Sequence, residues 1–274
     1  EIKLETGRLA RQADASVTVQ FGNAILLATV VSNKEAKEGV DFLPLSVDYQ
    51  EKFASSGKIP GGFLKREGRL SDYEVLICRL VDRALRPLFP EDYHADTQVM
   101  IQMISADDTV APDSLAALAA SAAITISDIP FAGPISETRV ARIDGKLVCN
   151  PSPAEIEESD IDIMVGATEE NITMVEGEFA EVSEEEMIEA IQFGHAEIKR
   201  HCQALKEWEK ELGKTEKREY SHENSDEELR KMIHDATYQK VYDVCKEGIA
   251  DKALRKEKFN AIKDEYLETL PEDH

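Results

Sequence analysis

The stretch at residues 57–69 combines glycines, an aromatic ring and cations, and it carries the strongest chemical signal in the sequence. It reads Gly57-Lys58-Ile59-Pro60-Gly61-Gly62-Phe63-Leu64-Lys65-Arg66-Glu67-Gly68-Arg69. Glycines let a backbone bend and approach a ligand closely. An aromatic ring can stack on a base, worth ~1–3 kcal/mol, while cations hold phosphates. The composition therefore favours contact with a single-stranded nucleic acid; the alternative is an ordinary surface loop whose Phe63 packs into the core.

A row of arginines follows this loop. Arg79, Arg83 and Arg86 are spaced i, i+4 and i+7, so they share one face if the segment is helical. Such a row could make a second line of phosphate contacts. The alternative is a solvated face whose arginines pair with nearby acids, since exposed ion pairs are common and contribute little. Arg69, at the end of the loop, belongs with the candidate phosphate contacts.

Acidic residues at two places could suggest a metal site. The run Asp107-Asp108-Thr109-Val110-Ala111-Pro112-Asp113 lacks the glycine and the distal glutamate of an EF-hand loop. Helix capping by Asp113 or a neighbour is the simpler interpretation. Asp160 and Asp162 fall on an expected strand, where solvated carboxylates suffice. We assign no catalytic residue and no metal ligand from these patterns.

Charge is distributed unevenly along the chain. The 274 residues carry a net charge of −23, of which residues 151–274 contribute −18 and residues 1–150 only −5. Within residues 58–86 the balance reverses to seven basic against four acidic side chains. A locally basic patch on an acidic protein can still attract a phosphate backbone, because exposed charges are screened beyond roughly 8–10 Å.

The elements that would position these residues are mostly strands in the first part of the chain. Apolar alternation and apolar runs predict strands over 16–20, 24–31, 99–105 and 160–167. Pro44 predicts that the extended stretch 42–49 is an edge strand or an irregular strand. Asp144-Gly145 predicts a hairpin between residues 140–143 and 146–149. Residues 172–176 could pair with 160–167.

Helix signals begin with Ser71 and Glu74, which form an S-x-x-E capping box, and Ser183 and Glu186 repeat that pattern. An alanine-rich helix is expected over 112–127. Behind Ser183 an apolar stripe at helical spacing runs from Ile188 to Leu212, and it includes His195, which we interpret as a satisfied core histidine. Strand signals stop after a polar stretch. We therefore expect an α+β domain over 1–212, a linker over 213–224 and an all-helical segment over 225–274, with Ser225 and Glu228 capping its first helix.

Size and composition set further bounds. No apolar run approaches the ~18–20 residues that a membrane span needs. Cys78, Cys149, Cys202 and Cys245 are scattered singly, without a C-x-x-C pair. Together with the lack of a basic-then-apolar leader, this favours a protein of the reducing cytoplasm that does not contact a membrane.

Several motifs together resemble the first ribonuclease-PH-like domain of the polynucleotide phosphorylase family. They are Thr6-Gly7-Arg8-Leu9-Ala10-Arg11-Gln12-Ala13, Asp41-Phe42-Leu43-Pro44-Leu45, Tyr49-Gln50-Glu51, Lys58-Ile59-Pro60-Gly61, Lys65-Arg66-Glu67-Gly68-Arg69, Arg79-Leu80-Val81-Asp82-Arg83-Ala84-Leu85-Arg86-Pro87-Leu88-Phe89, Ile129-Pro130-Phe131, Gly133-Pro134-Ile135 and Phe193-Gly194-His195. The similarity covers most of residues 1–212. The segment after it matches the expected position of the family's all-helical domain, although it is shorter.

The resemblance implies a ribonuclease-PH-like fold (ribosomal protein S5 domain 2-like) and a part in 3′→5′ phosphorolytic RNA degradation in mRNA turnover. In that family RNA and phosphate yield nucleoside diphosphates, reversibly, within a homotrimeric ring. The phosphorolytic site, with its Mg²⁺, belongs to a second such domain. The first domain contributes a channel loop of two aromatic and two basic residues, which here is Phe63-Leu64-Lys65-Arg66.

The sequence departs from the family pattern at several positions. Leu64 replaces an aromatic residue, and Lys65 replaces an arginine, which keeps the charge but loses the planar fork. Where the active domain has a serine-rich phosphate pocket, this chain has Ala111-Pro112-Asp113-Ser114-Leu115-Ala116. Asp162 aligns with an active-domain aspartate but makes no site alone.

Three hypotheses follow. The chain is the RNA-guiding half of a phosphorolytic enzyme, or a non-catalytic RNA-binding ring subunit of an exosome-like assembly, or a metal-dependent hydrolase using Asp107, Asp108, Asp113 or Asp162. The helical segment favours the first over the second. The acids show no ligand spacing that supports the third. The expected RNA contacts are Phe63, Leu64, Lys65, Arg66, Arg69, Arg79, Arg83 and Arg86.

Overall fold

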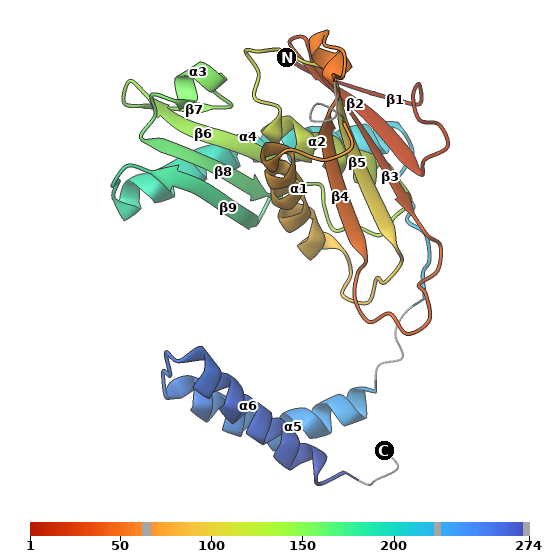
Figure 1. Ribbon diagram of the computed structural model, residues 1–274. Coiled ribbons are helices and arrows are strands. Elements are labelled where there is room, and N and C mark those ends of the chain that lie inside the picture. Colours follow the sequence, from red (N-terminus) through yellow and green to blue (C-terminus); the bar gives the residue numbers. More distant parts are fainter. Residues whose placement is uncertain (62–66, 222–225, 271–274) are drawn as a thin grey trace. The chain divides into compact units, whose positions relative to one another are not determined.

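The computed structural model describes residues 1–61, 67–221 and 226–270, and the chain divides into two compact units, residues 1–222 and 223–274. The described part of the first unit contains two β-sheets and helices α1 to α4, and that of the second contains helices α5 and α6 (Figure 1). The α+β class expected from the sequence is confirmed.

The first sheet contains the strands nearest the N-terminus. Its spatial order is β1 (Ile2–Thr6), β2 (Ala15–Phe21), β3 (Ala24–Ser32), β5 (Thr97–Ser105) and β4 (Leu45–Glu51). Neighbours are antiparallel except β4 and β5, which are parallel. Pro44 directly precedes β4, so the predicted edge strand is confirmed. Strand β1 was not predicted from the sequence.

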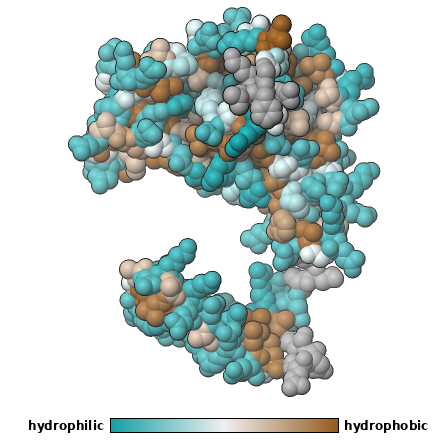
Figure 2. Space-filling view, viewed as in Figure 1, coloured by the Kyte–Doolittle hydropathy of each residue, from teal (hydrophilic) through white to brown (hydrophobic). Residues whose placement is uncertain are grey.

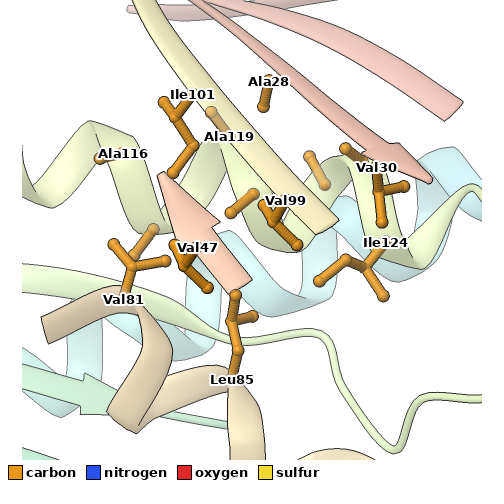
Figure 3. Close-up of a cluster of buried hydrophobic side chains, with 14 of the residues drawn as sticks. Ala28, Val30, Val47, Val81, Leu85, Val99, Ile101, Ala116, Ala119 and Ile124 are labelled. Atoms are coloured by element: carbon orange, nitrogen blue, oxygen red, sulfur yellow. The ribbon is translucent and has the colours of Figure 1, made fainter. Parts of the chain in front are cut away.

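Helix α2 (Asp113–Thr125) packs on the inner face of this sheet, and each of its residues is buried. Alanines at six of its 13 positions let the helix lie close to β2 and β3. Figure 3 shows Ala116, Ala119 and Ile124 facing apolar side chains of the strands, including Val99 and Ile101. Burying a side chain such as Ile101 contributes ~1.5–3 kcal/mol, so this layer forms the main core.

The second sheet is antiparallel throughout and has the order β7 (Lys146–Cys149), β6 (Ser136–Ile143), β8 (Ile161–Ala167) and β9 (Ile172–Phe179). The predicted hairpin joins β6 and β7, and Asp144 and Gly145 take the positive φ values of 49° and 73° that such a turn needs. A short helix, α3 (Pro153–Ile156), follows β7 and was not predicted.

Helix α4 (Glu184–Glu211) covers one face of the second sheet and begins at the predicted Ser183–Glu186 capping box. Gly194 is required at the closest approach, because a Cβ there would lie 2.8 Å from Cγ2 of Val140. His195 is half-buried, and its Nε2 lies 3.0 Å from the Thr168 carbonyl oxygen, as expected for a satisfied histidine. The ends of the predicted apolar stripe, Ile188 and Leu212, are exposed instead.

Helix α1 (Asp72–Leu85) lies at the junction of the two sheets (Figure 1) and continues into a 3₁₀ turn, η3 (Arg86–Leu88). Its predicted capping box is present, with Ser71 and Glu74 bonding each other's backbone N–H. Ile77, Val81 and Leu85 form its buried face. The opposite face, which carries Arg79 and Arg83, is exposed, so the fold presents the predicted arginine row at the surface.

Residues 214–221, which fall in the expected linker, are bound to the first unit. The Lys217 ammonium donates to the carbonyls of Thr125 and Ser127, at 2.6 and 2.9 Å, at the C-terminal end of α2. Arg218 donates to the Ser32 carbonyl at 3.0 Å and pairs with Asp128. The polar composition of this segment therefore reflects hydrogen bonding to the fold rather than a free tether.

The second unit contains α5 (Glu227–Lys246) and α6 (Lys252–Leu267). Its first helix is capped by Asp226, whose side chain accepts from the Leu229 N–H; Ser225, the predicted capping residue, lies outside the described residues. Val244 is buried between the helices, whereas Met232 and Tyr238 are exposed, and hydrophobic surface is visible in Figure 2. Among the described residues, no helix is long and apolar enough to cross a membrane.

Candidate nucleic-acid interface

The glycine-rich loop leaves the fold after a 3₁₀ turn, η1 (Phe53–Ser56), which Gly57 closes with a φ of 68°. Its two flanks are tied together. The Glu67 carboxylate accepts from the Phe53 N–H at 2.7 Å, and the Gln50 side chain donates to the Glu67 carbonyl at 3.1 Å. Phe63, Leu64, Lys65 and Arg66 lie outside the described residues. The flanks nevertheless anchor both ends of the predicted contact loop at one place.

Two of the predicted cations have no side-chain partner among the described residues. Arg69 and Arg79 are exposed, and neither forms a hydrogen bond or ion pair with another described residue. An unpaired guanidinium keeps its full hydrogen-bonding capacity for a phosphate, to which it can donate two parallel bonds. These two residues are therefore the described cations that are best prepared to contact a nucleic acid.

The other two arginines of the row are engaged by the protein. Arg83 pairs with Glu176 on β9. Arg86 donates to both carboxylate oxygens of Asp82, at 3.0 and 2.6 Å, and to the carbonyls of Leu43 and Leu45, each at 3.1 Å. Arg86 thereby fastens the end of α1 to the start of β4. The helical spacing places Arg79, Arg83 and Arg86 at one surface. The tertiary structure then pairs Arg83 and Arg86 with acids and leaves Arg79 unpaired among the described residues.

A cavity of about 1120 Å³ opens beside the flanks of the loop. Its lining includes the cations Lys52, Lys58 and Arg69 and the acids Glu51, Glu67 and Glu74. Burial raises the pKa of Glu51; the hydrogen bond from the Tyr49 hydroxyl opposes that rise, and the nearby charges of Glu74 and Asp113 add to it. The mixed charge does not by itself select an anion.

Arg139 binds two acids that the sequence analysis singled out. They are Asp113, in the segment at the phosphate-pocket position, and Asp162, which aligns with an active-domain aspartate. The Nε and Nη2 of Arg139 donate to Asp162 at 2.7 and 2.6 Å, and its Nη1 donates to Asp113 at 2.6 Å. The Asp113 side chain is only 6% exposed. We call this arrangement the Arg139 clip. One guanidinium binds both carboxylates and offsets one of their two negative charges, so each acid already has an arginine partner.

Asp113 does not cap α2, contrary to the sequence interpretation. Pro112 occupies the N-cap position and the helix has no side-chain cap. Asp113 instead accepts from the N–H of Ser114, at 2.8 Å, and pairs with Arg139. Local sequence favoured capping because it is the usual role of an aspartate before an apolar run. The true partner, Arg139, is 26 residues away on strand β6.

Asp107 also has a structural partner. Its carboxylate accepts from the Asn23 N–H at 3.0 Å and from the Thr109 hydroxyl at 2.7 Å. The Thr109 hydroxyl, followed by these backbone bonds, lowers the pKa of Asp107 to about 2. Within residues 1–61, 67–221 and 226–270, no three His, Cys, Asp or Glu side chains are grouped to hold a metal. The geometry therefore gives the hydrolase hypothesis no support.

Two inward-facing charged residues of β6 were missed by sequence reasoning. Arg139 and Glu137 lie on the same face of the strand, two residues apart. Glu137 and Arg139 stand at alternate positions of an expected strand, and this spacing shows that they share one face. The spacing does not show whether that face is buried. Glu137 is only 1% exposed.

Comparison with known proteins agrees with this fold. Residues 1–130 match the model of the 3′ exoribonuclease family, domain 1, and residues 133–197 match domain 2 of the same family. The structure of rice (Oryza sativa) Rrp46 superposes with a TM-score of 0.62 at 16% identity, covering 77% of this chain and 94% of that one. That likeness concerns the fold alone.

Curated relatives extend the match along the whole chain. The polyribonucleotide nucleotidyltransferase of Cytophaga hutchinsonii is 62% identical over 274 residues, and that of Bacteroides fragilis is 58% identical over 272 residues. The chain spans 38% of the length of each relative. The predicted ribonuclease-PH-like fold is confirmed, and the chain belongs to the 3′ exoribonuclease family, within which it is similar to one part of the polyribonucleotide nucleotidyltransferases.

Proposed function

We propose that this chain is the N-terminal, RNA-guiding and ring-forming part of a 3′→5′ phosphorolytic exoribonuclease. The whole enzyme would convert single-stranded RNA and phosphate to nucleoside diphosphates, reversibly, during mRNA turnover in the cytoplasm. It would act as a homotrimer and use Mg²⁺ at a site outside this chain. We propose residues 1–212 as the first ribonuclease-PH-like domain, 213–224 as the connection and 225–274 as the start of the all-helical domain.

The Arg139 clip is the observation that supports a non-catalytic role. Phosphorolysis needs a site that attracts phosphate, and Mg²⁺ needs free oxygen ligands. Here the acid that stands in the phosphate-pocket segment would repel phosphate, and the acid aligned with an active-domain aspartate is bound by arginine. The residues present therefore fit neither group, and we derive no chemical step at this position.

RNA contact would come from the loop and from the free cations beside it. Phe63 would stack on a base, and Arg66, Arg69 and Arg79 would hold phosphates. Lys65 would add charge without bidentate geometry, and Leu64 would add apolar contact without stacking. Arg83 and Arg86 would contact RNA only by sharing or leaving their present acidic partners, so we expect smaller contributions from them.

The runner-up is a non-catalytic RNA-binding ring subunit of an exosome-like assembly. The match to rice Rrp46 covers 94% of that chain, so this alternative is compatible with the fold. The helical unit argues against the ring subunit, since the relatives from Cytophaga and Bacteroides match this chain through α5 and α6 as well. We therefore keep the phosphorolytic enzyme as the parent protein.

The test combines chemistry and binding in the same samples. The 274-residue chain is incubated with oligoadenylate, phosphate and Mg²⁺, and release of nucleoside diphosphates is measured beside RNA affinity. We expect binding without release. Phe63→Ala should weaken binding about fivefold or more, from the loss of one stacked base. Arg66→Ala should reduce the salt dependence of log K by about 0.7, the value for one phosphate contact on a single strand.

Arg200→Ala is the matched control, because this exposed arginine lies on α4 and, within the described part of the chain, pairs with Glu197 alone. It should leave affinity and salt dependence unchanged. Equal losses in the control and the loop variants would show that binding is non-specific. Robust diphosphate release would show that the non-catalytic assignment is wrong and would direct attention back to Ser114 and Asp162.

A further inference from the structure

The carboxyl group of Glu137 is buried without a partner. The residue is 1% exposed, and neither Oε1 nor Oε2 has a hydrogen-bond partner among the described residues. Buried polar side chains are nearly always hydrogen-bonded, so an orphaned carboxyl needs an explanation. An apolar side chain would fill the same position without that cost.

Glu137 lies beneath α1 where the helix crosses the second sheet. It pairs with Gly166 on β8, which in turn pairs with Met174 on β9. A Cβ on Gly166 would lie 3.2 Å from Cβ of Ala84, 3.3 Å from Cβ of Met174 and 3.4 Å from Cγ of Glu137. The glycine thus lets α1 approach closely, and the carboxyl is enclosed by the same contact.

Few charged groups face this carboxyl. The charged group that faces it from α1 is Arg83, which pairs with Glu176 of β9. The charged group that faces it from α2 is Asp113, which the Arg139 clip holds. The residues that pair beside it on β8 and β9, Gly166 and Met174, are themselves uncharged. Burial first, and then the Asp113 charge, raise the pKa of Glu137 well above its ordinary range, while Arg83 opposes the rise.

We propose that Glu137 is a proton-linked latch under α1. As the neutral acid it lets the helix seat on the second sheet, with Arg83 paired to Glu176. As a carboxylate it must reach water or the Arg83 guanidinium, and either requires α1 to move away from the sheet. The latch is a property of the fold, and it holds whether or not the proposed RNA function does.

The direction of the pH effect follows from proton binding. An open α1 exposes Glu137 to water, where its carboxyl ionises near pH ~4.3, whereas the seated form keeps its proton to a higher pH. At pH values between the pKa of Glu137 in the open form and its pKa in the seated form, the seated form therefore binds one more proton. The equilibrium constant that favours the seated form over the open form is greatest below the ordinary carboxyl pKa. Above that pKa it falls by about tenfold per pH unit, until the pKa of the seated form is reached.

Amide hydrogen exchange of the 274-residue chain tests the latch directly. Exchange of peptides within α1 is measured from about pH 5.5 to 8.5 and corrected for the intrinsic chemical rate, so that it reports local opening. In the wild type we expect α1 opening to increase about tenfold per pH unit over part of that range. In Glu137→Gln, which cannot ionise, we expect no such increase.

Glu178→Gln is the matched control, since this acid is exposed on β9 and has no hydrogen-bond or ion-pair partner among the described side chains. It should keep the wild-type slope. Equal slopes in the wild type and in Glu137→Gln would overturn the latch. If Glu137→Gln does not fold, infrared spectroscopy of the wild type tests the latch instead, by measuring whether a buried carboxyl keeps its proton. A protonated-carboxyl band that titrates with α1 opening supports the latch, and absence of that band at neutral pH overturns it.

Discussion

Replacing Arg139 by methionine is the most informative perturbation of the first unit. Methionine has similar length but donates no hydrogen bond. The change removes three short bonds of 2.6–2.7 Å and leaves Asp113, whose side chain is 6% exposed, as a buried carboxylate without its cation. Breaking a buried pair by removing one partner costs about 3–5 kcal/mol. We therefore expect a loss of about that size in the free energy of unfolding.

Urea unfolding followed by tryptophan fluorescence measures this loss. Trp208 is the single tryptophan of the chain, and it packs against the main core, so its signal reports the first unit. The denaturation midpoint should shift while the m-value stays constant, if the change affects stability alone. The second unit has no tryptophan and does not contribute to this signal.

A second substitution shows whether the uncompensated charge is the cause. Asp113→Asn in the Arg139→Met background removes that charge, so it should recover about 0.5–3 kcal/mol, the usual coupling between contacting residues. By itself, Asp113→Asn should destabilise the protein, because the clip loses one carboxylate. A loss below about 1 kcal/mol for Arg139→Met would place the clip with ordinary surface ion pairs. Failure of the second substitution to rescue would refute the buried-charge argument.

Three further outcomes are expected. Arg218→Ala should lower the unfolding free energy by about 1–3 kcal/mol, measured by urea, since it leaves the Ser32 carbonyl and Asp128 without their donor. Arg79→Ala should weaken RNA binding in a salt-dependent manner with unchanged thermal stability, whereas Arg86→Ala should mainly lower the melting temperature; the reverse pattern would contradict the division into free and engaged arginines. Gly194→Ala should destabilise by about 1–3 kcal/mol through overpacking, and an unchanged melting temperature would show that the sheet can yield.

Much of the fold was predictable from local pattern. Both capping boxes, the Asp144-Gly145 hairpin and the alanine-rich buried helix appear where the sequence indicated. Each of these depends on residues within one turn or one strand period, so neighbours in sequence decide it. Strand β1, Ile2–Thr6, was missed although its apolar and polar residues alternate, because five residues with two charged side chains, Lys3 and Glu5, give only a short pattern.

The candidate site was only partly predictable. Loop composition and helical spacing identified the cations and placed Arg79, Arg83 and Arg86 on one helix. They could not show that Arg83 pairs with a glutamate 93 residues away, because that depends on how α1 meets β9. The loop residues 63–66 remain a prediction that the RNA-binding experiment tests.

The sequence by itself determined which segments form helices and strands, where the cations gather and which family the chain belongs to. The tertiary structure decided which charges remain free. Arg139 holds two acids, 26 and 23 residues away, and Glu137 is buried beneath α1. Alternation along a strand says which residues share a face, but only the packing of helices on that face decides whether a charge there meets water, a partner or neither.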